Sequence, residues 1–171
     1  IMFLIQQANL RSEQLKSEQM NALHNEIKAA TEAPNKELTN INVASFASPD
    51  GGVKLNTTLA ENREKNTVNY MKKSLKKGKI DADMTAEFTA QDWEGFKELV
   101  SKSNIQDKEL ILNVLSMYSD PEQREREIKN MSSVFNELKE EILPELRRSQ
   151  IVNSTDIQGK TDAEIMAAFR N

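Results

Sequence analysis

The chain has no cysteine and only one histidine, His24, among its 171 residues. The missing cysteines exclude disulfides and thiolate metal sites within these residues. The histidine has no second ligand at a metal-binding spacing and no partner for a catalytic triad, so we place it on a polar helix surface. Carboxylates are common, but they occur in helical charge runs, which are usually solvated faces. The sequence therefore predicts neither an enzyme nor a cofactor.

The chain also lacks a basic excess and a long apolar run. Its formal net charge of −4 and pI near 5.2 argue against nucleic acid as the main partner, because phosphate binding needs a basic face. No stretch approaches the roughly eighteen apolar residues of a membrane span. The apolar start, residues 1–5, lacks the basic region of a signal peptide. Because the chain begins with Ile1, we expect a mature product or an excised fragment, with any export signal or lipid-attachment cysteine out of view.

One stretch, residues 41–73, organises the rest of the chain. Ile41 and Val43 open a β-prone apolar segment, and the SPDGG run at 48–52 is the strongest turn signal, because proline fixes φ and glycine permits positive φ. Apolar residues then recur at mainly helical spacings, at Leu55, Leu59, Val68, Met71 and Leu75. The pattern predicts a strand, a turn and a helix that ends at Gly78. Such a junction aims backbone N–H groups and the positive end of the helix dipole at one point, which favours anion binding.

The first half of the chain supplies the other early elements. Residues 1–10 are expected to form the first strand. A helix then begins at Ser12 or Ser17, either of which can cap it, and stops before Pro34. Residues 39–46 are predicted as the second strand.

The second half supplies two more strands with helices between them. Residues 83–89 alternate as a third strand, and residues 146–157 form the last. Residues 90–143 are helical throughout, with expected helix starts at the Thr89–Asp92 box, at Asp107 and at the Asp120–Pro121 pair. We predict about three helices inserted before the last strand.

These elements define an α+β fold class. The prediction is a mixed sheet in the order βαβαβ, with helices packed on one face, then the inserted helices and a closing strand. One domain is expected over residues 1–157. Residues 158–171 are expected to begin a helical linker or a downstream region.

Three patches of the chain, residues 15–23, 47–71 and 147–152, follow one known pattern in the same order. Residues 47–51 (ASPDG), 56–63 (NTTLAENR) and 67–71 (TVNYM) match a strand, Thr-Asp-x-x-Gly, then Asn-x-x-Leu-Ser-x-x-Arg-Ala and a Tyr-Leu pair. Residues 15–23 are similar to a Leu-Lys-Pro-Glu helix start, and residues 147–152 (RRSQIV) to an Arg-Arg-Val-Glu-Ile strand start. Together they resemble the OmpA-like peptidoglycan-binding domain family, with a longer helical link before the last strand than the family usually has.

The resemblance implies a noncovalent anchor in the cell envelope. A protein of this family sits on the periplasmic side of the Gram-negative outer membrane, as part of an outer-membrane protein or lipoprotein. Its partner is peptidoglycan, gripped at the diaminopimelate residue of the stem peptide. An Asp takes the ammonium and an Arg takes the carboxylate, because a zwitterion needs both signs close together and Arg offers a bidentate fork.

The implied ligand site maps onto the turn and the following helix. Arg63 occupies the family's arginine position, whereas Ser48 stands where the pattern has its aspartate. Asp50, two residues later, is the candidate replacement. The predicted ligand-binding residues are Ser48, Asp50, Gly51, Asn56 and Arg63. In the competing interpretation, Asp50 is only the usual aspartate of a Pro-Asp-Gly turn, and Arg63 braces the strand–helix junction.

A second function fits the same fold. With a degenerate ligand site, the domain would be a protein-interaction scaffold of the envelope, acting through the inserted helices. Trp93 lies at their start; a tryptophan at helical spacing is more often a core residue than a sugar platform, but it is also a candidate partner contact. A cavity at the turn with Arg63 pointing into it favours the anchor. A filled cavity beside an apolar patch favours the scaffold.

Overall fold

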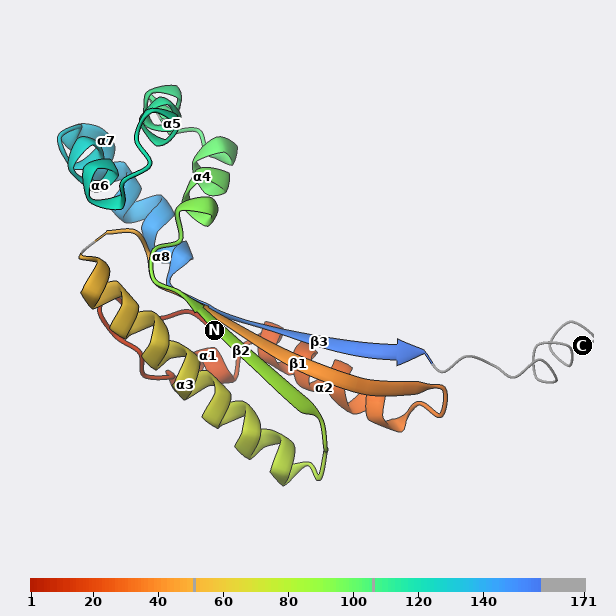
Figure 1. The fold of residues 1–171 in the computed structure, drawn as a ribbon. Helices are drawn as coiled ribbons and strands as arrows, with labels where there is room; N and C mark the ends of the chain where they lie inside the picture. Colours follow the sequence, from red (N-terminus) through yellow and green to blue (C-terminus); the bar gives the residue numbers. More distant parts are fainter. Residues whose placement is uncertain (51, 106, 158–171) are drawn as a thin grey trace, which may run out of the picture.

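A three-stranded mixed sheet lies at the centre of the computed structural model, which describes residues 1–50, 52–105 and 107–157 (Figure 1). The middle strand, β1 (Lys36–Phe46), pairs in parallel with β2 (Asp83–Thr89) and antiparallel with β3 (Ser149–Ile157). The parallel pair is joined through a helix, as parallel strands require. The α+β class predicted from the sequence is confirmed, and so are the positions of these three strands.

The two faces of the sheet differ in chemistry. Ile41 and Val43 of β1 are fully buried on the face covered by α2 (Glu18–Glu32) and α3 (Val53–Lys77). On the opposite face Asn42 accepts a hydrogen bond from Thr85 at 2.9 Å and donates one to Glu87 at 3.4 Å. This alternation is what a sheet with one wet face shows, and it confirms that the helices pack on one side.

The helices of the first half begin and end at recognisable signals. A short helix, α1 (Ser12–Leu15), precedes α2, and the Ser17 hydroxyl caps α2 by accepting a hydrogen bond from the Met20 amide at 3.2 Å. Gly78 ends α3 as predicted. The apolar core under the sheet consists of six buried residues from α2, β1 and α3: Met20, Ile27, Leu38, Ile41, Met71 and Leu75.

The inserted helices build a separate apolar core beyond one end of the sheet (Figure 1). They are α4 (Trp93–Lys102), α5 (Lys108–Met117), α6 (Pro121–Lys129), α7 (Ser132–Glu137), a π-helical turn η1 (Leu138–Ile142) and α8 (Leu143–Leu146). The third predicted helix is thus divided into several pieces after Lys129. Asp120 caps α6 by accepting a hydrogen bond from the Gln123 amide at 3.2 Å, as its Asp-Pro start indicated.

Two local predictions about element starts were wrong. Residues 1–10 form no strand: Met2 makes an isolated bridge to Arg148, and Gln6 adopts a φ of 55°, which interrupts an extended run. The cap of α4 is Asp92 itself, whose carboxylate accepts from the Gly95 amide at 3.0 Å, so Thr89 remains the last residue of β2.

The predicted apolar face of α3 was also wrong in its first half. Leu55 is 45% exposed. The buried positions are instead Asn56, Ala60, Arg63, Thr67, Met71 and Leu75. The buried face of α3 is thus displaced by one residue from the predicted face. The cause is its buried polar side chains, which hydrogen bond to the chain segments that α3 covers. The helix predicted within residues 160–171 lies outside the described residues.

No helix in the described ranges combines the length and apolarity needed to cross a bilayer. This finding agrees with the absence of a membrane span predicted from the sequence.

Candidate functional site

The predicted site lies where β1 turns into α3. Ala47 continues the strand by donating to the Thr89 carbonyl at 3.1 Å, and its own carbonyl accepts from the Asp92 amide at 3.1 Å. The chain beyond Ala47 is thereby fixed against both β2 and the start of α4. A turn held on both sides can present side chains in a defined direction.

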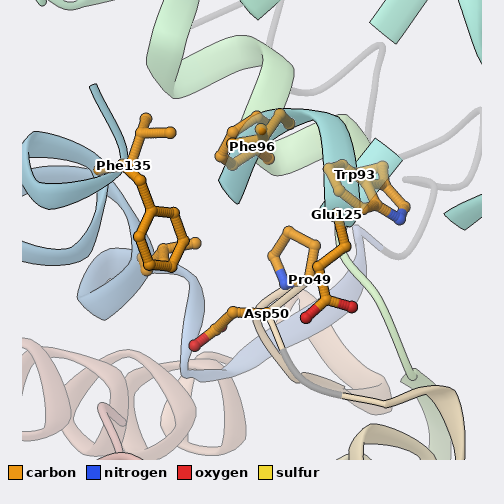
Figure 2. A pocket seen from close by; sticks show the side chains of 9 residues that line it. Pro49, Asp50, Trp93, Phe96, Glu125 and Phe135 are labelled. Carbon is orange, nitrogen blue, oxygen red and sulfur yellow. The ribbon is translucent and has the colours of Figure 1, made fainter. Parts of the chain in front are cut away.

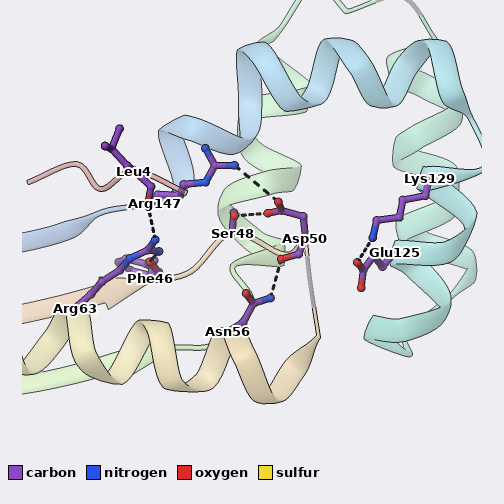
Figure 3. Close-up of polar contacts among 9 residues, drawn as sticks. All are labelled: Leu4, Phe46, Ser48, Asp50, Asn56, Arg63, Glu125, Lys129 and Arg147. Carbon is purple, nitrogen blue, oxygen red and sulfur yellow. Dashed lines mark hydrogen bonds and ion pairs between the residues drawn. The ribbon is translucent and has the colours of Figure 1, made fainter. Parts of the chain in front are cut away.

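Three of the predicted residues form one hydrogen-bonded unit in this turn (Figure 3). The Ser48 hydroxyl donates to the Asp50 carboxylate, and the Asn56 amide donates to the Asp50 backbone carbonyl at 3.0 Å. Ser48 and Asn56 are both buried. They orient Asp50, with Ser48 supporting the acid two residues later through its hydroxyl. Gly51 lies outside the described residues.

Arg63 is buried beneath the turn and bonded to backbone. Its Nε donates to the Gln7 carbonyl at 3.0 Å, and its two terminal nitrogens donate to Phe46 at 2.9 Å and Leu4 at 3.3 Å. Three of its five N–H donors are therefore used. The Phe3 ring centroid lies 5.1 Å from the guanidinium carbon. These contacts tie the N-terminal segment to β1 and α3, as the bracing interpretation of Arg63 expects.

Burial also affects the charge of Arg63. Desolvation first, and then the positive field of Arg147, lower its pKa to about 10, while Asp50 acts in the opposite direction. At neutral pH the guanidinium stays protonated. It therefore adds a fixed positive charge to the wall of the site even though backbone carbonyls occupy much of its hydrogen-bonding capacity.

Arg147 is the residue that sequence reasoning missed. It lies just before β3, is 9% exposed, and its guanidinium is 3.8 Å from the second carboxylate oxygen of Asp50 (Figure 3). Burial lowers its pKa, and Asp50 partly offsets this. The sequence signal was the Arg-Arg pair at the start of the last strand, which resembled the family but gave no indication that the first arginine reaches the turn.

These residues line a cavity of about 320 Å³. Its charged wall residues are Asp50, Arg63, Lys129, Lys139 and Arg147. Its other wall residues are Ile5, Gln6, Ala47, Ser48, Leu55, Asn56, Leu59 and Phe135. The structure thus brings together all four of the predicted site residues that it describes. A volume of this size suits a small organic group rather than a single ion.

The start of α3 adds to the positive character of this cavity. The helix begins at Val53, has no acidic residue in its first turn, and contributes Leu55 and Asn56 to the wall. The positive end of its dipole therefore adds to the arginine charges. The arrangement can hold a zwitterion, with the ammonium at Asp50 and the carboxylate at the arginines.

A second, apolar cavity of about 20 Å³ lies on the other side of the turn (Figure 2). Pro49 and Asp50 border it together with Trp93, Phe96 and Phe135 of the inserted helices. The Trp93 and Phe96 rings are packed edge to face at 5.5 Å, and Arg124 lies 5.5 Å from the Trp93 centroid. Trp93 is thus half-buried and packed against the core of the inserted helices.

No family model matches the chain, and no curated protein matches it significantly. Within the residues that the structure describes there is also no cluster of three or more potential metal ligands.

Proposed function

We propose that this domain binds peptidoglycan noncovalently in the Gram-negative envelope, on the periplasmic side of the outer membrane. The ligand is the zwitterionic end of the diaminopimelate side arm. The OmpA-like motifs suggest this ligand, and the single observation that supports it best is the cavity in which Asp50 and Arg147 lie side by side. In this proposal Asp50 binds the ammonium, and Arg147 binds the carboxylate with help from the positive charge of Arg63.

The physical basis is the pairing of opposite charges at the wall of a partly enclosed cavity. Asp50 is held by Ser48 and Asn56, so it needs little reorganisation when a ligand ammonium approaches. The Asp50–Arg147 contact of 3.8 Å is longer than a hydrogen bond. A ligand that carries both charges can therefore replace this loose pair with two shorter, charge-assisted hydrogen bonds.

The test is a calorimetric titration with a diaminopimelate-containing muropeptide. Asp50→Asn and Arg147→Ala should each weaken binding about tenfold or more, because each removes a charge-assisted contact. Arg126→Ala is the matched control, since Arg126 is exposed on α6 and does not line the cavity. Circular dichroism shows whether each variant is folded. Undetectable wild-type binding at millimolar ligand, or full affinity in both cavity variants, contradicts the proposal.

A protein-interaction scaffold is the second candidate, and one observation favours it. Leu110 and Met117 are 51% and 71% exposed and lie seven residues apart on α5, which places them on one helix face. The two candidates differ in the effect of Met117→Glu. Muropeptide affinity should not change in this variant if the cavity is the functional site, whereas a scaffold that uses α5 would lose its protein partner.

A further inference from the structure

The cavity wall has two origins in the chain. Asp50, Arg63 and Arg147 come from the sheet and the segments beside it, whereas Lys129 comes from α6 and Lys139 from the π-helical turn η1. The inserted helices therefore take part in the site. They form one side of the cavity at the turn.

The described wall carries more positive than negative charge. Four cationic side chains line it, and Asp50 is the one carboxylate among the described lining residues. Glu125, beside the cavity, is 2.6 Å from the Lys129 ammonium (Figure 3). A neutral zwitterion paired with Asp50 and Arg147 would leave this excess of positive charge in place.

Lys139 differs from the other cationic side chains of the described wall in its contacts. Its ammonium makes no ion pair or hydrogen bond with any described residue, and it lies 5.9 Å from the centroid of the Phe135 ring, which also borders the cavity. The contact with the ring holds the lysine beside the cavity, and its exposure lets the ammonium meet a ligand from solution.

We infer that Lys139 binds a second carboxylate of the ligand, one outside the zwitterionic side arm. This inference rests on the proposed function and deepens it: the inserted helices make the site selective for stem peptides with an additional free carboxylate near the diaminopimelate. In such a peptide the side arm meets Asp50 and Arg147, and the carboxylate at the end of the chain meets Lys139.

The experiment uses two muropeptides that end at the diaminopimelate residue. One has a free terminal carboxylate, and in the other this group is a primary amide. The wild-type protein should bind the acid about fivefold more tightly than the amide, the size expected for a solvent-exposed ion pair. Lys139→Met should bind both equally, with the affinity that the wild type has for the amide.

Lys97→Met is the matched control, because Lys97 is exposed on α4, does not line the cavity, and its loss changes the net charge equally. The inference is overturned if Lys139→Met keeps the preference for the acid, or if Lys97→Met loses it to the same extent. Wild-type binding of both peptides with equal affinity also overturns it and leaves the proposed function intact. Failure of the wild type to bind either peptide overturns the proposed function itself.

Discussion

The buried side chains of the sheet region differ in polarity from those of the inserted helices. In the sheet region (residues 1–89 and 147–157), the inner side of α3 includes Arg63 and Thr67, and Ser45 and Ser149 are buried against it. Among the described side chains of the inserted helices (residues 93–105, 107–131 and 135–146), all the buried ones are apolar, from Phe96 to Leu146. Polar groups of the inserted helices cap helix starts, as at Asp120, and form ion pairs on exposed faces, as between Lys102 and Glu98.

This difference shows where the fold has been adapted to a site. A buried polar network costs desolvation and is stable only when every member is satisfied, whereas an apolar core needs only matching volume. Arg63 of the polar network lines the cavity, and so does Phe135, which packs against the apolar core. We therefore expect the two regions to respond differently to substitution.

The largest effect is expected at Arg63. Arg63→Met keeps most of the side-chain volume but leaves the carbonyls of Leu4, Gln7 and Phe46 without this donor. The free energy of unfolding should fall by about 3–5 kcal/mol, as measured by urea denaturation. A loss below about 1 kcal/mol would mean that water or other donors replace the guanidinium, and that the polar network is not required for the fold.

A smaller loss of about 3 kcal/mol is expected for Leu138→Ala, which opens a cavity in the core of the inserted helices. Because the two core clusters share no residue, hydrogen exchange should accelerate mainly at amides of α4 to α8. Equal acceleration at the amides of β1 would show that the two regions unfold as one unit, against the distinction drawn here.

Ser149→Ala tests the uncharged part of the buried polar network, the hydroxyls of Ser45, Thr67 and Ser149. The Ser149 hydroxyl is 2.6 Å from that of Ser45 and accepts from Thr67 at 2.8 Å. Its removal leaves two buried hydroxyls short of a partner, so we expect a loss of about 1–3 kcal/mol in thermal or urea unfolding. Ser116→Ala, on an exposed face of α5, is the control and should stay within about 0.5 kcal/mol of the wild type.

The smallest effect is expected at the Asp120 cap. Asp120→Ala removes one hydrogen bond to the exposed start of α6 and should cost about 0.5–1 kcal/mol. A loss larger than that of Ser149→Ala would reverse the order predicted for surface and buried polar groups.

The sequence predicted well the elements whose ends are set by local signals. The limits of β2 were predicted exactly as residues 83–89, and Ser17, Gly78 and Asp120 were identified as helix signals that the structure uses. These features depend on local chemistry, namely caps, turns and alternation. Prediction failed in two places: residues 1–10, expected as a strand, make only an isolated bridge at Met2, and Leu55 was assigned to the buried face of α3, where Asn56 lies instead.

The site was predicted only in part, for the same reason. The sequence placed Ser48, Asp50, Asn56 and Arg63 at one turn and the helix that follows it, and the structure brings all four to one cavity. The role of Arg147 depends on a contact across 97 residues of sequence, from Asp50 to the start of β3. Lys139 reaches the cavity through the packing of the inserted helices. Neither contact leaves a local signal in the sequence.

The most direct test of the central claim is a two-dimensional ¹⁵N–¹H NMR titration of the labelled protein with a diaminopimelate-containing muropeptide. We predict saturable shifts at the Ser48 amide, at the Asn56 side-chain amide and at the amides around Arg147, with little change on α5. Shifts confined to the surface of the inserted helices, or no shifts at millimolar muropeptide, would contradict the assignment of the cavity as the ligand site.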